Sequence, residues 1–223
     1  MSDPGSIRDL LRGVDVFPPE VPHFAPEGAP AAPVDLFVEW LRYAVTVGVP
    51  APHAVTLSTL GADGVPDARV VILRDANASG WQVASTAASP KGIQLEHRPA
   101  AALTFFWPAV GRQIRVRGRV TKGSAAENDA DFQRRHPSAR ALVLAGRQSE
   151  SLPLPGGEAM VAAAVARSAA RMVDQPRLRA PAWTVFTVVP DAVEFWQANP
   201  ERRHLRLRYL RVGQDWAKVL LWP

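Results

Sequence analysis

The hydrophobic pattern of this chain changes its period after residue 48, and that change limits the folds open to it. Residues 36–47 carry apolar side chains at helical spacing, and Gly48 ends the stretch. Beyond it, most apolar segments are short and separated by turn residues, as in strands. Strands and helices do not alternate regularly, which argues against a parallel sheet with crossover helices. The sequence therefore predicts a mainly β fold with peripheral helices (α+β), an antiparallel barrel.

The expected elements can be given by residue range. Strands are predicted at residues 53–60, 68–74, 81–86, 101–107, 113–120, 183–189, 192–197, 206–212 and 216–221, with a turn at 61–64. Ser89 followed by Pro90 is typical of a helix start, with the serine as N-cap. Ser124 and Glu127 form a capping-box pattern, and a long helix is expected at 158–173.

Residues 1–33 differ from the rest, because they hold seven of the 21 prolines. Proline fixes φ and removes a backbone donor, so we expect an extended, flexible arm with no helix and no inner strand. Phe17, Val21 and Phe24 are able to hold part of this arm against a surface; the alternative is an untethered tail. The expected organisation is an arm over residues 1–33 and one domain over residues 34–223.

Composition removes several kinds of chemistry. No cysteine is present, which excludes disulfides, iron–sulfur clusters and thiol catalysis. The five histidines lack the spacing of metal ligands, so no metal site is expected. No targeting signal or membrane-spanning run is visible, and we expect a cytoplasmic protein without a membrane partner. An enzyme of this composition would take its chemistry from an organic cofactor.

Arginine dominates the charge, since only three of the 26 basic residues are lysines. Guanidinium groups bind phosphate and carboxylate bidentately, so this balance favours anionic ligands, unless it reflects arginine-rich codon usage alone. Arg69 opens one strand, Ser85 ends the next, and Lys91 lies in the first turn of the helix that follows. Free N–H groups at a helix start suit a phosphate. These residues together predict an anion pocket at one rim of the barrel.

One predicted strand is strongly basic. Arg115, Arg117 and Arg119 share one strand face, which is typical of a solvated surface. Binding of single-stranded nucleic acid would also require interleaved aromatic residues, and these are missing, so no nucleic-acid partner is expected. Gln113 on the same strand offers an amide to a heterocycle.

The C-terminal segment is the most specific part of the sequence. In an extended chain Arg202, His204 and Arg206 would share one face. With the other motifs, this segment resembles the pyridoxine/pyridoxamine 5′-phosphate oxidase family of FMN-dependent split-barrel proteins, from about residue 33 to residue 223. The matching motifs, in the family's order, are Arg69–Arg74, Ser85–Thr86, Ser89–Leu95, Phe106–Trp107, Arg112–Gly118, Arg147–Ser149, Val193–Gln197, Arg202–Arg206 and Trp216–Pro223.

The resemblance implies a homodimer with FMN at the subunit interface. Arg202 and His204 match the residues that flank the substrate over the flavin, and they are the catalytic candidates. The family's reaction is hydride transfer from the carbon bearing an amine or hydroxyl to flavin N5, followed by reoxidation by O2. The cofactor contacts that the resemblance assigns are Arg69, Val70, Val71, Ile72, Leu73, Arg74, Ala84, Ser85, Lys91, Gln113, Gln148, Ser149, Trp196 and Arg206.

Departures from the family pattern concern the substrate more than the cofactor. Arg74 stands where the family has lysine, and Pro90 where it usually has arginine. Phe132 takes the place expected for a tyrosine that binds the substrate phosphate, and Arg135 or His136 the place of an arginine. The expected substrate contacts are Arg74, Phe132, Arg135, Arg202 and His204.

The leading hypothesis is an FMN-dependent oxidase of pyridoxamine or pyridoxine 5′-phosphate, or of a related small anionic or aromatic heterocycle. One alternative is an oxidase of secondary metabolism that takes a larger aromatic substrate, like the family's phenazine-pathway members. Another is a split barrel that binds flavin or another heterocycle without turnover. A nucleic-acid-binding module is the most distant alternative.

Overall fold

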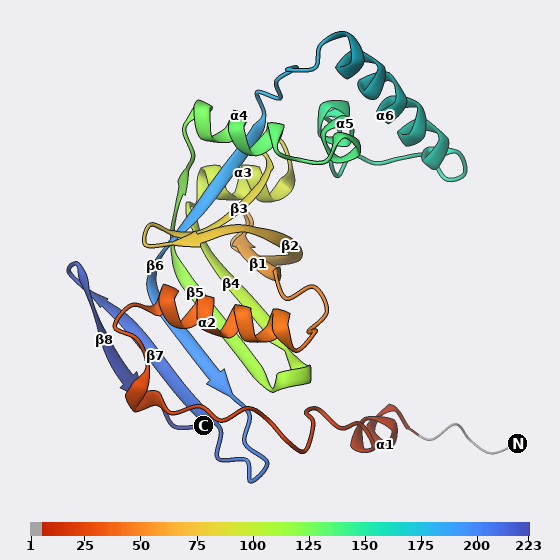
Figure 1. The fold of residues 1–223 in the computed structure, drawn as a ribbon. Coiled ribbons are helices and arrows are strands. Elements are labelled where there is room, and N and C mark those ends of the chain that lie inside the picture. Colours follow the sequence, from red (N-terminus) through yellow and green to blue (C-terminus); the bar gives the residue numbers. More distant parts are fainter. Residues whose placement is uncertain (1–5) are drawn as a thin grey trace, which may run out of the picture. The chain divides into compact units, whose positions relative to one another are not determined.

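The barrel expected from the sequence is confirmed in a computed structural model that describes residues 6–223. The strands form one antiparallel sheet in the order β3-β2-β1-β4-β5-β6-β7-β8, and a further pairing of β3 with β6 closes the first six into a barrel (Figure 1). The strands are β1 (Ala54–Leu60), β2 (Pro66–Asn77), β3 (Gly80–Thr86), β4 (Ala100–Trp107), β5 (Arg112–Lys122), β6 (Trp183–Gln197), β7 (Leu205–Val212) and β8 (Asp215–Leu220).

The α-helices also follow the expected patterns, with exceptions. Both capping predictions are confirmed: Ser89 accepts a hydrogen bond from the amide of Gly92, and Ser124 and Glu127 form a reciprocal capping box. The helix α5 was not predicted; His136 caps its start, and proline occupies its first position. The helices are α1 (Ile7–Arg12), α2 (Pro33–Thr46), α3 (Pro90–His97), α4 (Ala125–Gln133), α5 (Pro137–Ala145) and α6 (Gly157–Asp174).

The two strands predicted at 183–189 and 192–197 are wrong as separate elements, because β6 runs through both. Residues up to Val188 pair with β3, and residues from Ala192 pair with β7. Pro190 lies between these two stretches, where it interrupts neither of the two pairings.

The N-terminal arm is also more ordered than predicted. Its expected lack of helix is wrong, because α1 forms with Ser6 as its N-cap. This helix precedes the proline-rich segment that begins at Pro18, so proline does not interrupt it. Further along, Phe24 is buried and its ring meets the ring of Trp40 edge-on, with 5.1 Å between centroids. The arm is therefore held to its own chain at this point.

The chain groups into two compact units, and neither ends at residue 33. Unit 1 comprises the described residues up to 53 together with residues 104–115 and 192–223, and unit 2 comprises residues 54–103 and 116–191. In unit 1 the apolar face of α2 provides the core. Phe37 packs on Phe105 with 4.9 Å between ring centroids, and Trp40 meets Phe195 at 5.2 Å. The tyrosine hydroxyl of Tyr209 donates to the carbonyl of Pro30.

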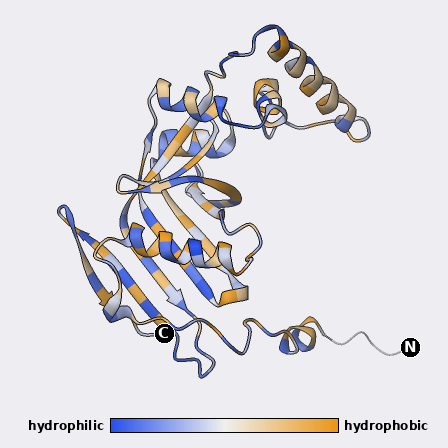
Figure 2. Ribbon diagram, in the orientation of Figure 1, coloured by the Kyte–Doolittle hydropathy of each residue, from blue (hydrophilic) through white to orange (hydrophobic). Residues whose placement is uncertain are grey.

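Unit 2 holds most of the closed part of the sheet and the remaining helices. Val55 and Leu57 alternate with less buried residues along β1, as the period of two requires. Gly118 lets β5 approach β6 closely, since a Cβ there would lie 1.9 Å from the carbonyl oxygen of Val189. The helices α5 and α6 pack on each other, and Figure 2 shows much of α6 in hydrophobic colours.

Within residues 6–223, no helix is both long enough and apolar enough to cross a membrane.

Candidate functional site

One cavity of unit 2 has a volume of about 1510 Å³. Its walls come from β2, β3 and the start of α3 on one side, and from α5, α6 and the segments around them on the other. Basic side chains outnumber acidic ones along these walls. The basic residues that line it are Arg69, Arg74, Lys91, Arg134, Arg135, His136, Arg147, Arg167 and Arg171, and the acidic ones are Asp67 and Glu150.

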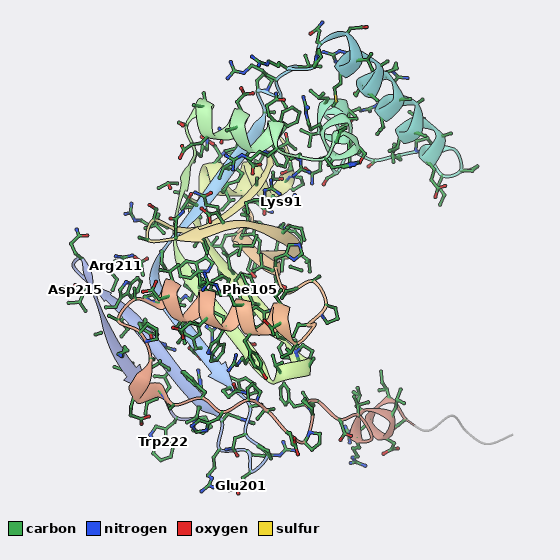
Figure 3. The ribbon with its side chains drawn as sticks, in the orientation of Figure 1. Lys91, Phe105, Glu201, Arg211, Asp215 and Trp222 are labelled. Atoms are coloured by element: carbon green, nitrogen blue, oxygen red, sulfur yellow. The ribbon has the colours of Figure 1, made fainter. Side chains whose placement is uncertain are left out.

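The start of α3 places a buried lysine at this cavity, beside the hydroxyl of Ser85 near the end of β3. Lys91, labelled in Figure 3, is 8% exposed and its Nζ donates to Oγ of Ser85 at 3.3 Å. Oγ of Ser85 lies 3.1 Å from Oγ of Ser89, and it also donates to Oε1 of Gln148 at 3.4 Å. Gly92 allows α3 to sit tightly on the preceding turn, because a Cβ there would lie 2.5 Å from the carbonyl oxygen of Ala87.

Lys91 is a cation that lacks a direct counter-ion. It makes no ion pair with any carboxylate in the part of the chain that the structure describes. Burial lowers the pKa of Lys91, and the nearby charge of Arg69 lowers it further, while Asp67 acts weakly in the opposite direction. An anion bound beside Lys91 would restore the preference for its charged form.

Arg69 lies on β2 and is fixed by the chain around it. Its guanidinium pairs with Asp67, donates to Oγ1 of Thr59 at 2.5 Å and to Oε1 of Gln94 at 3.1 Å. Hydrogen bonding with Gln94 lowers the pKa of Asp67 most; desolvation opposes it, but the charge of Arg69 adds to the lowering, so the pKa lies below its ordinary value. Arg69 is thus oriented at the cavity wall without being wholly neutralised there.

A second basic group lies where β2, α4 and β6 meet. Nε of Arg74 donates to Oδ1 of Asp131 at 2.8 Å, and the indole N–H of Trp183 donates to Oδ2 at 2.9 Å. The guanidinium of Arg135 stacks over the Trp183 ring, with its Cζ 4.3 Å from the ring centroid. Burial lowers the pKa of Arg135, and the charge of Arg74 lowers it further. Its Nε is buried and has no hydrogen-bond partner among the described residues.

The structure brings together most of the site residues predicted within unit 2. Two of them lie elsewhere. Leu73 does not line the cavity, and Phe132 is fully buried, with its ring near Trp183 and under the guanidinium of Arg140. Phe132 therefore offers no surface to a substrate. The predicted residues that do line the cavity are Arg69, Val70, Val71, Ile72, Arg74, Ala84, Ser85, Lys91, Arg135, Gln148 and Ser149.

The remaining predicted residues lie in unit 1: Gln113, Trp196, Arg202, His204 and Arg206. The prediction that the last three share one strand face is wrong. Arg202 has a φ of 62°, in the left-handed region, and β7 begins only at Leu205. The turn carries His204 over Trp196 instead, with 4.7 Å between ring centroids, and Nδ1 of His204 accepts the amide N–H of Asn199.

Arg206 and Arg208 converge on one buried carboxylate in unit 1. Arg206 donates twice to Oε1 of Glu194, at 3.0 and 2.8 Å, and Arg208 donates to Oε2 at 3.0 Å. Arg115, predicted to be a solvated residue, lies 3.8 Å from the same carboxylate. Burial raises the pKa of Glu194, but the hydrogen bonds from Arg208 and Arg206 outweigh it, so the pKa lies below its ordinary value.

Sequence reasoning missed Asp131, which lies behind the cavity wall, and also Arg134, Arg167 and Arg171, which line the cavity. Asp131 precedes the predicted Phe132 by one position on α4, and one step along a helix turns the side chain by about 100°. Phe132 consequently faces the core, while Asp131 meets Arg74. The helical period, combined with the apolar character of Phe132, was the signal that identifies which of the two is buried.

Comparison with known proteins gives matches over most of the chain. Residues 43–197 match the family model described as pyridoxamine 5′-phosphate oxidase, and residues 183–223 match that of the pyridoxine 5′-phosphate oxidase C-terminal dimerisation region. The pyridoxine/pyridoxamine 5′-phosphate oxidase of Bordetella petrii is 41% identical over 198 residues, which cover 88% of this chain and 92% of the relative.

Solved structures also match over most of the chain. PhzG from Burkholderia lata, in complex with tetrahydrophenazine-1-carboxylic acid, matches with a TM-score of 0.84 and 29% identity, covering 91% of this chain and 99% of that one. A pyridoxamine 5′-phosphate oxidase-related, FMN-binding protein of Nostoc punctiforme matches with a TM-score of 0.67 and 20% identity, covering 86% and 98%. The second likeness concerns the fold alone.

Proposed function

Because the chain belongs to the pyridoxamine 5′-phosphate oxidase family, we propose that it is an FMN-dependent oxidase of a small heterocyclic substrate. The observation that carries this proposal is that Lys91, at the start of α3, is buried without a carboxylate partner among the described residues. A buried ammonium without a counter-ion is costly unless an anion binds beside it. The family's cofactor brings such an anion, its phosphate.

The residues around Lys91 fit that phosphate. Ser85 supplies a hydroxyl, Arg69 a guanidinium held by its neighbours, and the start of α3 a favourable dipole. Gln148 and Ser149 add an amide and a hydroxyl on the cavity wall. In this proposal these residues bind the phosphate and orient the flavin ring along β2.

We assign the unit 1 residues to the other part of the family's flavin site, which the resemblance places at the interface of a homodimer. The match of residues 183–223 to the dimerisation region supports that assembly. In the proposed roles, Gln113, Trp196 and Arg206 contact the flavin. Arg202 and His204 flank the substrate and orient its reacting carbon.

FMN would supply a two-electron acceptor at N5 and a route from there to O2. The substrate carbon that bears an amine or hydroxyl loses two electrons and two protons, and O2 takes them up as hydrogen peroxide. An imine product then hydrolyses to the aldehyde and ammonia. The chain's own part is to bind both partners, hold the carbon in position and exclude water.

Two substrate classes remain as candidates. The curated relatives are named pyridoxine/pyridoxamine 5′-phosphate oxidases, which supports a pyridoxine-type ring. The 29% identical PhzG structure supports a larger aromatic substrate of the phenazine type. The cavity volume of about 1510 Å³ exceeds the roughly 300–1,000 Å³ of ordinary ligand pockets, so it admits either class beside a flavin.

The test is a titration of the purified apoprotein with FMN, followed anaerobically by a panel of pyridine and phenazine heterocycles. We expect tight FMN binding, bleaching of the flavin by the substrate, and one peroxide per turnover when air is admitted. A protein that binds no FMN would contradict the proposal. A protein that binds FMN but is bleached by no member of the panel would favour a flavin-binding barrel without turnover.

Arg202→Ala and His204→Ala refine this test. Because both side chains are assigned to the substrate, each variant is expected to slow anaerobic flavin bleaching by about 100-fold, within the range typical of lost positioning or proton transfer. FMN affinity should stay unchanged, and it is measured by quenching of flavin fluorescence. Loss of FMN instead would assign these residues to the cofactor.

A further inference from the structure

At one end of the cavity, basic and acidic side chains partly neutralise one another, and the proposed function gives these side chains no role. Arg74, Arg135 and Trp183 line the cavity there, whereas Asp131 lies behind them and does not. Both oxygens of the Asp131 carboxylate are engaged, one by Arg74 and the other by the indole N–H of Trp183. The side chain of Asp131 is only 14% exposed, so water screens this pair less than a surface pair.

The sum of these charges limits the anion that fits. Two guanidinium groups and one carboxylate leave a net charge of one positive unit. A carboxylate ligand carries one negative charge, whereas a phosphate ester carries nearly two. The carboxylate of Asp131, close to Arg74, would repel the second negative charge of a phosphate.

The surroundings of Arg135 nevertheless favour an anion at this end of the cavity. Its guanidinium is stacked on Trp183, and its buried Nε has no hydrogen-bond partner among the described residues. An unpaired buried donor is unfavourable, and an anionic ligand at this wall would lower that cost.

We propose that Asp131 is a specificity-determining residue that makes this end of the cavity prefer a singly charged carboxylate to a doubly charged phosphate ester. The proposal rests on the proposed function only in taking this cavity as the substrate site. It concerns the anionic group of the substrate and leaves the size of its ring open.

The experiment compares two ligands that share one pyridine ring, 5-pyridoxate and pyridoxine 5′-phosphate. Their dissociation constants are measured by titration calorimetry on the FMN-loaded protein and on the apoprotein, for the wild type and for Asp131→Asn. Asparagine keeps the size of the side chain and an oxygen to accept from Trp183. The wild type should bind 5-pyridoxate more tightly. Asp131→Asn should shift the ratio of the two constants about tenfold toward the phosphate, as expected for one charge at close range under partial screening.

A matched control lies two residues away on α4. Asp129 pairs with Arg179, which does not line this cavity, so Asp129→Asn removes the same charge from the same helix. We expect that control to leave the ratio unchanged. The double variant Arg74→Gln/Asp131→Asn restores the local net charge and should return the ratio to the wild-type value.

Three results would overturn the proposal: a wild type that prefers the phosphate, an equal shift in Asp131→Asn and Asp129→Asn, or no binding of either ligand. A failure of the proposed function can be distinguished from a failure of this proposal. A protein that binds no FMN would contradict that function, while calorimetry on the apoprotein would still decide the charge preference. Thermal unfolding of each variant confirms that the folded protein is being compared.

Discussion

Two buried charged side chains, Glu194 in unit 1 and Lys91 in unit 2, differ in how their charge is balanced. In unit 1, Glu194 is buried and accepts hydrogen bonds from Arg206 and Arg208, so the chain supplies its own counter-ion. In unit 2, Lys91 is just as buried but has only the hydroxyl of Ser85 as a hydrogen-bond partner among the described residues. The first arrangement is complete in itself. The second is completed only by an anion from outside.

This difference separates cations whose charge the chain itself balances from cations whose charge it leaves unbalanced. A charge balanced within the chain contributes to the fold, and its removal should reduce stability. A charge that is left unbalanced should instead reduce the stability of the free protein and increase its affinity for an anion. The following predictions test that distinction, beginning with the largest effect.

Glu194→Ala should have the largest effect on stability. It leaves the guanidinium groups of Arg206 and Arg208 without the carboxylate that they share, and breaking a buried pair from one side costs about 3 kcal/mol. Urea unfolding measures the loss. The control is Glu201→Ala, whose partner Arg203 is exposed, and it should cost less than about 1 kcal/mol. Equal losses in the two variants would contradict a structural role for Glu194.

The pH dependence of stability tests the interaction of Glu194 with Arg206 and Arg208 in a second way. Because the pKa of Glu194 in the folded protein lies below its ordinary value of 4.5, its contribution is fully present above pH 4.5. That contribution is lost as the pH falls through the lowered pKa. Glu194→Gln should therefore show a shallower loss of unfolding free energy on acidification than the wild type does.

Unlike Glu194→Ala, Lys91→Met should not reduce the stability of the free protein. It removes a buried unpaired charge, so the apoprotein should be no less stable, as measured by its Tm. FMN affinity should fall about 10- to 150-fold, since a charge-assisted bond to phosphate contributes about 1.5–3 kcal/mol. Lys122→Met, at an exposed lysine paired with Glu96, should leave FMN affinity unchanged. A destabilised Lys91→Met apoprotein with normal FMN affinity would show that Lys91 belongs to the fold.

The sequence predicted only part of the contrast between Lys91 and Glu194. Periodicity and capping signals identified the barrel strands and the start of α3, and therefore placed Lys91 in a first helical turn. Periodicity and capping depend only on residues that are close together in the sequence. The partnership of Glu194 with Arg206 and Arg208 depends on the register between β6 and β7, which places Glu194 opposite Arg208. No pattern within either strand specifies that register.

Local reasoning also failed where a turn replaces a strand. Arg202 and His204 have the alternating spacing of a strand face, but residues 198–204 form a turn in which Arg202 has a positive φ. There, tertiary structure decided the orientation of the side chains. The error at Phe132 was of another kind: it was placed by its likeness to a tyrosine position, although the helical period and its apolar character already indicate a buried residue.

Arg112→Met should have a smaller effect than Glu194→Ala, although Arg112 is equally buried. Its guanidinium is balanced by aromatic faces, 4.1 Å from the Trp40 centroid and 4.9 Å from that of Tyr43, rather than by a carboxylate. Burial accordingly lowers its pKa to about 10. Methionine can fill the same apolar space, but Oε1 of Gln197 loses a donor, so we expect a loss of about 1 kcal/mol in urea unfolding. A loss as large as that of Glu194→Ala would show that aromatic faces hold this cation as firmly as a carboxylate does.

The smallest expected effect is the pH dependence of FMN affinity. Burial and Arg69 lower the pKa of Lys91 in the free protein below its ordinary value of 10.5, so the lysine begins to lose its proton at a lower pH than an exposed lysine. A phosphate binds the charged form better, and FMN affinity should therefore decline as the pH rises from neutral toward 10.5. Fluorescence titration over this range should show a decline of a few-fold. Lys91→Arg keeps its charge throughout and should remove that component, whereas an identical decline in both proteins would mean that another group controls it.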